Sequence, residues 1–255
     1  MKKRLSKLGS RKGSLLALAL GLALPDLLLA CPYCAKIPED AAALKIEATR
    51  VVKVDELDSF IFEVTVEGEA GSVMPEAKGE LDGAPVLGYV FPTNLKPSAV
   101  GFGDVEGVLA LAATSHPDFD DTPLWDENAD GDWKNDGRIW HTHWVVLHQD
   151  ERIGSLSVRQ FDAGDESVKL PPTNPGMPMY MDSPGFSVVT RGSQLRIVVP
   201  ANRIREAGDF RFDAVVAFMQ VNTSDKSRPM LGVYKVYSVA SGDLSLPFEV
   251  ETGKH

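Results

Sequence analysis

Residues 44–66 read LKIEATRVVKVDELDSFIFEVTV, two runs rich in β-branched and aromatic side chains on either side of a short acidic turn. Val, Ile, Thr and Phe favour extended backbone, and Asp-rich segments between such runs are typical of chain reversals. The stretch therefore predicts a β-hairpin, with strands over Leu44–Val54 and Phe60–Val66 and a turn at Asp55–Asp58.

The same pattern of short strand-like runs and turn residues continues to the C-terminal end. Further strands are expected over Pro85–Phe91, Val105–Ala113, Arg138–His148, Ser155–Phe161, Phe186–Thr190, Leu195–Val199, Phe210–Val221, Leu231–Val239 and Leu246–Val250. After residue 30, no long window keeps the apolar stripe of an amphipathic helix. We therefore expect an all-β fold, an antiparallel β-sandwich of about ten strands with long loops. No repeat or linker divides residues 31–255, which predicts a single β-sandwich domain.

Residues 1–30 have the composition of an export signal. Lysines and arginines gather in residues 2–12, an apolar run follows from Leu15 to Leu24, and Ala30 precedes Cys31. A basic start, a short apolar segment and a small residue before a break are typical of a secretory signal, and this run is too short to span a bilayer. We expect cleavage near Cys31 and a periplasmic or cell-surface location in a bacterium.

Leu28-Leu29-Ala30-Cys31 also resembles a lipobox, the cleavage motif of bacterial lipoproteins. The resemblance implies that Cys31 becomes the first mature residue and is acylated, which would anchor the protein to a membrane. The sequence departs from the family pattern at Asp26 and Leu29, so plain cleavage stays open beside acylation. After plain cleavage, Cys31 and Cys34 can pair as a disulfide or contribute to a metal site.

The chain is acidic, with a formal net charge of −10 at pH 7. Removal of the basic segment 1–30 would make the remainder more acidic still. No basic patch or stripe remains, which argues against nucleic acid as a partner. The sequence also lacks the Gly-x-Ser-x-Gly, Walker, Rossmann and His-Glu-x-x-His motifs, so it names no catalytic residues. These features favour a binding protein over an enzyme.

An acidic segment over residues 126–137 reads DENADGDWKNDG, with oxygen donors at alternate positions before Gly131. It resembles the calcium loops of EF-hands, dockerins and thrombospondin type 3 repeats, in which such donors converge on calcium because the glycine permits a sharp turn. The resemblance implies the calcium ligands Asp126, Asn128, Asp130, Asp132 and Asp136. The segment departs from the EF-hand at its last position, where Gly137 replaces the bidentate glutamate. A solvated acidic turn without an ion stays open as the alternative.

Directly after this loop, residues 138–148 read RIWHTHWVVLH. Side chains alternate between the two faces of a strand, so His141 and His143 share a face with Ile139, Val145 and Leu147. Two imidazoles on one apolar face are a common way for a β-sheet to bind zinc or copper. Hydrogen-bonded core histidines are the alternative reading.

A third ligand for this predicted transition-metal site has two candidate sources. The first is Met177, Met179 and Met181, because thioethers beside imidazoles favour copper, above all Cu(I). This set is similar in ligand type to that of periplasmic copper-binding β-sandwich proteins, although the methionines can also serve as apolar filling. The second source is His116, or a carboxylate of Asp118, Asp120 or Asp121, which would suit zinc, manganese or iron better.

Taken together, these motifs predict a metal-binding protein outside the cytoplasm, with calcium in the acidic loop and copper or zinc at the histidines. A metal-dependent enzyme that uses the same histidines is the first alternative. The second is a calcium-stabilised carbohydrate-binding or adhesive module. That alternative depends on exposed tryptophans near the acidic loop, namely Trp125, Trp133, Trp140 and Trp144.

Overall fold

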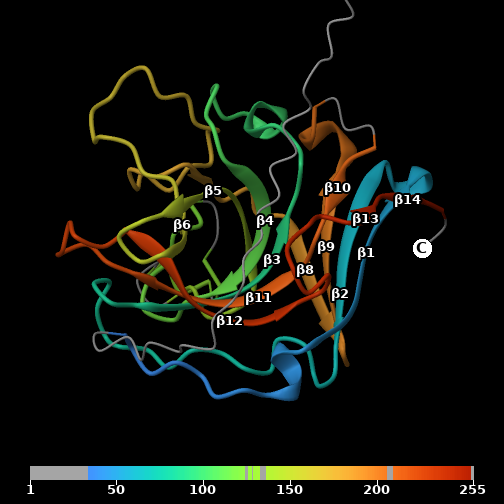
Figure 1. Ribbon diagram of the computed structural model, residues 1–255, viewed down its shortest axis with the longest axis horizontal. Coiled ribbons are helices and arrows are strands. Elements are labelled where there is room, and N and C mark those ends of the chain that lie inside the picture. The colour runs from blue at the N-terminus through green and yellow to red at the C-terminus, as the bar shows by residue number, and fades with distance from the viewer. Residues whose placement is uncertain (1–33, 124–125, 128, 133–135, 206–208, 254–255) are drawn as a thin grey trace, which may run out of the picture.

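The computed structural model describes residues 34–123, 126–127, 129–132, 136–205 and 209–253 (Figure 1). Their regular structure consists of β-strands and short 3-10 helices, so the predicted all-β class is confirmed. The 3-10 helices in the described part are η1 (Ala42–Leu44), η2 (Asp55–Leu57), η3 (Pro97–Val100) and η4 (Ala201–Arg203). No helix within these ranges combines the length and apolar character that a membrane span requires.

One layer of the fold is a five-stranded mixed sheet in the order β14-β1-β2-β9-β8. Its strands are β1 (Ile46–Val54), β2 (Ser59–Val66), β8 (Ser187–Arg191), β9 (Gln194–Pro200) and β14 (Glu251–Thr252). The predicted hairpin is its centre, because β1 pairs antiparallel with β2 from Val54↔Ser59 outward. Asp58 turns the chain in the left-handed region at φ 43°, which Asp tolerates better than most residues.

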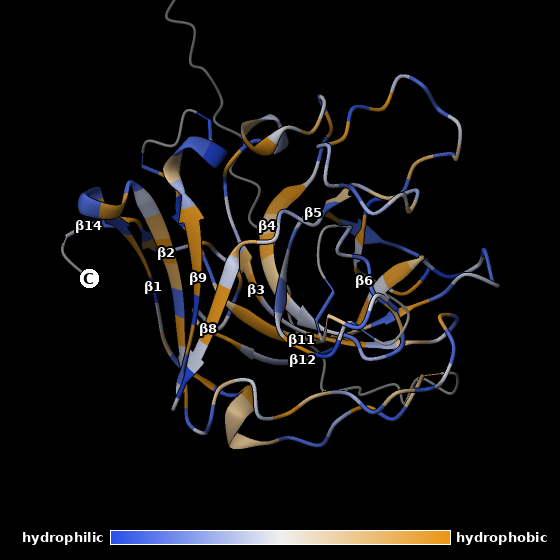
Figure 2. Cartoon of the chain, turned by 180° about the vertical axis from the view of Figure 1, so that it is seen from behind, coloured by the Kyte–Doolittle hydropathy of each residue, from blue (hydrophilic) through white to orange (hydrophobic). Residues whose placement is uncertain are grey.

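The other layer is a closed antiparallel barrel in the order β4-β3-β11-β12-β6-β5, and β5 pairs back onto β4. The barrel strands are β3 (Pro85–Pro92), β4 (Val108–Ser115), β5 (His141–Asp150), β6 (Ser155–Val158), β11 (Val215–Val221) and β12 (Leu231–Val239). A short strand, β7 (Met181–Asp182), also pairs with β5. A separate two-stranded ladder joins β10 (Arg211–Phe212) and β13 (Phe248–Glu249). Figure 2 shows the barrel and the five-stranded sheet side by side.

Alternation along the barrel strands divides the core in two. On β5, Trp144 and Val146 face the five-stranded sheet and pack with Phe62 of β2. Val145 and Leu147 point the other way, into the barrel lumen. The face that His141 and His143 are predicted to share with Val145 and Leu147 is therefore the one that faces the lumen.

Closure of the second sheet is the main departure from the predicted sandwich. β4 bonds to β3 along one edge and to β5 along the other, so its sheet has no free edge at β4. Full closure is one way for an all-β fold to remove exposed strand edges. Periodicity could not reveal it, because β3 and β4 are buried on both faces and their apolar runs give no alternation to read.

Strand boundaries also differ from the predictions. Strand β5 begins at His141 and not at Arg138, and Ile139 is 43% exposed, so Ile139 does not belong to the apolar surround expected for it. The expected strand over Phe210–Val221 is interrupted between β10 and β11. Strands β7 and β14 have two residues each, too few for a periodic signal.

Phe62 lies where the two layers meet, fully buried and in ring contact with Phe91, Trp144 and Phe210. Phe62→Ala should lower the free energy of unfolding by about 3–5 kcal/mol, because the cavity cannot fill by small shifts. Urea denaturation measures this loss. Leu57→Ala, at a side chain 60% exposed, is the control and should change stability by less than about 0.5 kcal/mol. Equal effects of the two variants would contradict this account of the core.

Candidate metal centre

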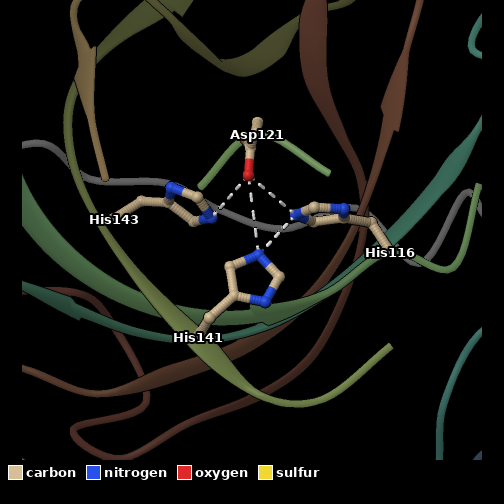
Figure 3. A group of neighbouring side chains, drawn as sticks. All are labelled: His116, Asp121, His141 and His143. Atoms are coloured by element: carbon tan, nitrogen blue, oxygen red, sulfur yellow. Dashed lines mark hydrogen bonds and ion pairs between the residues drawn. The ribbon is translucent and has the colours of Figure 1, made fainter. Parts of the chain in front are cut away.

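The centre forms where β4 ends and β5 begins. Thr114 pairs with His141 across the two strands, so His116, just beyond β4, comes beside His141 although 25 positions separate them in the sequence. The connecting loop folds back to bring in the carboxylate of Asp121. The result is a buried group of His116, Asp121, His141 and His143, whose potential ligand atoms all lie within 4.8 Å of one another. Figure 3 shows the three imidazoles around the carboxylate.

The separations in this group are close to those of atoms that share one ion. Nε2 of His116 lies 3.3 Å from Oδ1 of Asp121, and Nε2 of His141 and of His143 each lie 3.6 Å from the same oxygen. Ligand atoms about 2.1 Å from a common ion are roughly 3.0–3.4 Å apart. A separation of 3.6 Å is too long for a hydrogen bond. Three imidazoles and one carboxylate could therefore hold a metal ion.

The hydrogen-bond partners of the Nδ1 atoms determine which nitrogen of each ring carries the hydrogen. Nδ1 of His116 contacts the carbonyl of Phe119 at 2.7 Å, and Nδ1 of His141 contacts that of Ile139 at 2.8 Å. A carbonyl only accepts, so both Nδ1 atoms carry the hydrogen, and Nε2 is the nitrogen with a free lone pair whenever the ring is neutral. The two Nε2 atoms are 2.6 Å apart. Bonding of the outer ring nitrogen is the usual way to orient a metal-binding histidine.

Few hydrogen-bond donors reach the middle of this group. Nε2 of His143 and Oδ1 of Asp121 are buried with no hydrogen-bond partner among the described residues. The hydroxyl of Thr114 lies 3.5 Å from Nε2 of His141, at the limit of a hydrogen bond. A proton on His116 would serve its nearest acceptors and leave His143 unsatisfied. A cation at the centre would satisfy all four atoms.

The pKa values express the same imbalance. Burial lowers the pKa of His143 to about 3, so its ring is neutral and able to ligate at neutral pH. Burial would raise the pKa of Asp121, but the imidazoles of His143 and His116 hold it well below its ordinary value. The pKa of His116 is raised, because the Asp121 carboxylate outweighs the burial that opposes its imidazolium. The buried carboxylate of Asp121 therefore favours positive charge beside it, which a proton on His116 or a bound cation can supply.

Gly137, expected at the last position of a calcium loop, packs against the centre instead. Its carbonyl accepts the N–H of His116 at 2.7 Å. Its backbone has φ +91°, and a Cβ there would lie 2.1 Å from the carbonyl oxygen of Phe119 and 2.8 Å from Nδ1 of His116. Only glycine fits this approach, so Gly137 fixes the backbone that presents His116.

The predicted calcium ligands do not converge in the described part of the acidic loop. Asp126 accepts the N–H of Asp130 and of Gly131, at 3.2 and 2.7 Å. Asp130 accepts the N–H of Asp132, and Asp136 that of Glu127. The carboxylates thus stabilise turns, and among described residues only the histidine group meets the spacing of a metal site. Asn128 lies outside the described residues, and calcium binding by this loop stays a prediction.

The acidic side chains of this loop nevertheless crowd one another. Burial raises the pKa of Asp136, and the carboxylates of Asp120 and Asp126 raise it further. Asp118 and Asp120, both candidate ligands from the sequence, are engaged elsewhere. Asp118 accepts the N–H of Lys78 and of Gly79, and Asp120 accepts from Thr122. Of the three carboxylates considered, Asp121 alone joins the histidines.

The methionine run enters the barrel interior. Met179 and Met181 are buried in the lumen cluster, and Met177 is half-buried against it. All three line the same cavity as His116, Asp121 and His143. The methionines therefore lie near the centre, packed as apolar side chains of the lumen.

The predicted tryptophan surface is not formed by the tryptophans that the structure describes. Trp140 and Trp144 are buried in the core between the two layers, so they are not exposed platforms for sugar rings. Trp125 and Trp133 lie outside the described residues.

Of the two cysteines, the structure describes Cys34, which is disulfide-bonded. The predicted export signal and the predicted acylation site at Cys31 lie outside the described residues.

The chain matches no known protein-family model, no curated protein and no solved structure. Its function is therefore argued from the geometry of the centre.

Gly137→Ala should disrupt the presentation of His116. We expect Gly137→Ala to lower the free energy of unfolding by about 1–3 kcal/mol more than Gly164→Ala does, which is the usual cost of overpacking. Gly164 is the matched control because it has φ +94° and nothing within 4 Å of an added Cβ, so its variant carries only backbone strain. Urea denaturation of both variants measures the difference. Equal losses would mean that the close approach at Gly137 is not needed.

Proposed function

We propose that this protein binds one divalent transition-metal ion inside its barrel, through Nε2 of His116, His141 and His143 and Oδ1 of Asp121. The observation that carries the proposal is the convergence of four buried potential ligand atoms, two of which, Nε2 of His143 and Oδ1 of Asp121, have no hydrogen-bond partner among the described residues. Such a group is unfavourable in a low-dielectric interior unless positive charge compensates it. A single ion satisfies all four atoms at once.

The donor chemistry favours a divalent ion over Cu(I). Three imidazole nitrogens and one carboxylate oxygen suit Zn²⁺, Fe²⁺, Mn²⁺ or Cu²⁺, whereas Cu(I) prefers thioether and thiolate sulfur. The copper preference predicted from the sequence depended on Met177, Met179 and Met181. Apolar burial alone explains how these three methionines pack in the lumen. We propose that they line the lumen and do not bind the ion.

We also propose that the ion is bound outside the cytoplasm. The basic residues before Leu15 and the apolar run that follows them support export of the chain. Outside the cytoplasm, the protein would have to retain its ion. The enclosure of all four donors supports tight retention of the ion.

Replacing His141 and His143 together by Ala should abolish stoichiometric binding of Zn²⁺ or Co²⁺, because half of the donors are lost. His148→Ala is the matched control, since His148 lies on the same strand but bonds to Ser157 and faces Asp150 instead. Titration by calorimetry and metal analysis after dialysis measure the binding. Binding to the wild type should weaken as the pH falls through the raised pKa of His116, because a proton on that ring then competes with the ion. Undiminished binding by the double variant would refute the proposed site.

Replacing Met179 and Met181 together by Leu should leave Zn²⁺ affinity within about twofold of the wild type, because Leu and Met fill similar volumes. Competition titrations with a chromophoric chelator for Zn²⁺, and with a Cu(I) chelator under reducing conditions, measure both affinities. Loss of Cu(I) binding with Zn²⁺ binding intact would show that the thioethers are ligands, and would restore the copper alternative.

A further inference from the structure

The lumen of the barrel contains a cavity of about 70 Å³. Its walls are almost entirely apolar, with Val90, Ala112, Val145, Ala217 and Met219 among them. Three members of the metal centre, His116, Asp121 and His143, border the same cavity. The apolar lining therefore reaches side chains of the centre, and Thr114 is the one further polar side chain among the described residues of the lining.

The size and polarity of the cavity limit what it can hold. Its volume admits only a few molecules of the size of water, since each needs about 10–15 Å³ of the space that a water-sized sphere can reach. Apolar cavities of this kind stay dry and accept apolar guests such as xenon, because water finds no hydrogen-bond partners in them. A charged molecule would lose its hydration without compensation. The fitting occupants are uncharged, apolar and of only a few atoms.

The centre gives such an occupant something to bind. Four protein ligands complete a tetrahedral shell but leave positions open on an ion that prefers five or six ligands, as Fe²⁺ and Mn²⁺ do. Because three of the four donors border the cavity, an open position on that side would face the lumen. Small neutral molecules that also bind metals are chiefly diatomic gases.

We propose that the lumen is a binding chamber for a neutral diatomic gas, of the class of dioxygen or nitric oxide, which it delivers to the metal. The inference rests on the proposed metal site and adds the ligand class to it. Val236 is 40% exposed and Leu244 half-buried, so the lumen lies close to solvent at these two wall residues. Flexible methionines in the wall let a guest pass by rotamer changes.

Xenon tests the chamber without any metal. In ¹²⁹Xe NMR of the metal-free full chain, we expect one saturable site, and Ala217→Leu should weaken it by about tenfold or more because the added carbons occupy the cavity. Ala48→Leu adds the same three carbons at an exposed position of β1 in the five-stranded sheet and should leave xenon binding unchanged. Absence of a xenon site in the wild type would overturn the proposal.

Selectivity at the metal tests the link between chamber and centre, and it needs no variant. In Co²⁺-loaded wild type, nitric oxide should change the visible spectrum, whereas azide, a charged ligand of similar size, should not. Equal access of azide would overturn an apolar chamber. Xenon binding with no Co²⁺ uptake would instead refute the proposed metal site, so the two failures are distinguishable. Co²⁺ uptake with no response to nitric oxide would refute delivery of the gas to the metal.

Discussion

The antiparallel pairing of β4 with β5 determines both the architecture and the site. It closes the barrel, since β4 would otherwise be an edge strand. The same register places His143 opposite Ala112 and His141 opposite Thr114, which turns both imidazoles into the lumen. The pairing also brings His141, at the start of β5, beside His116, just beyond the end of β4, so the two ends of the connecting loop lie close together. A slip of one residue would move the histidines to the outer face, among the packed aromatic side chains.

This arrangement buries polar atoms in the middle of an otherwise apolar interior, which costs free energy. Four potential ligand atoms face one another on side chains no more than 6% exposed, and water cannot reach them freely. Proteins retain such groups when a proton or a metal compensates them. Surrounding contacts hold the group in place, namely the carbonyls of Phe119 and Ile139, the hydroxyl of Ser183 and the close approach of Gly137. The four side chains are thus held in place by contacts with residues that would not bind the ion themselves.

Sequence reasoning reached the all-β class, the hairpin at residues 44–66 and the shared face of His141 and His143, because each depends on local alternation. His116 and Asp121 were among the candidates for the third ligand, but choosing them over methionine requires the fold-back of the loop, which no local pattern encodes. Closure of the barrel was missed for a related reason: pairing partners are non-local. The alternating oxygen donors of the acidic loop predict a calcium site. In the structure its carboxylates mainly cap backbone N–H groups, a use that gives the same spacing in sequence.

Burial of the centre also bears on how the ion would be used. A carrier that exchanges metal with partners benefits from exposed, partly open ligands. Here His116, His141 and His143 have side chains only 2–3% exposed, and His116 is locked between Phe119 and Gly137. Release of an ion would require the contacts of His116 with Phe119 and Gly137 to open, a local opening rather than a side-chain rotation. An ion bound at this centre would therefore be resident rather than exchanged, and an apolar chamber at its side would control what reaches it.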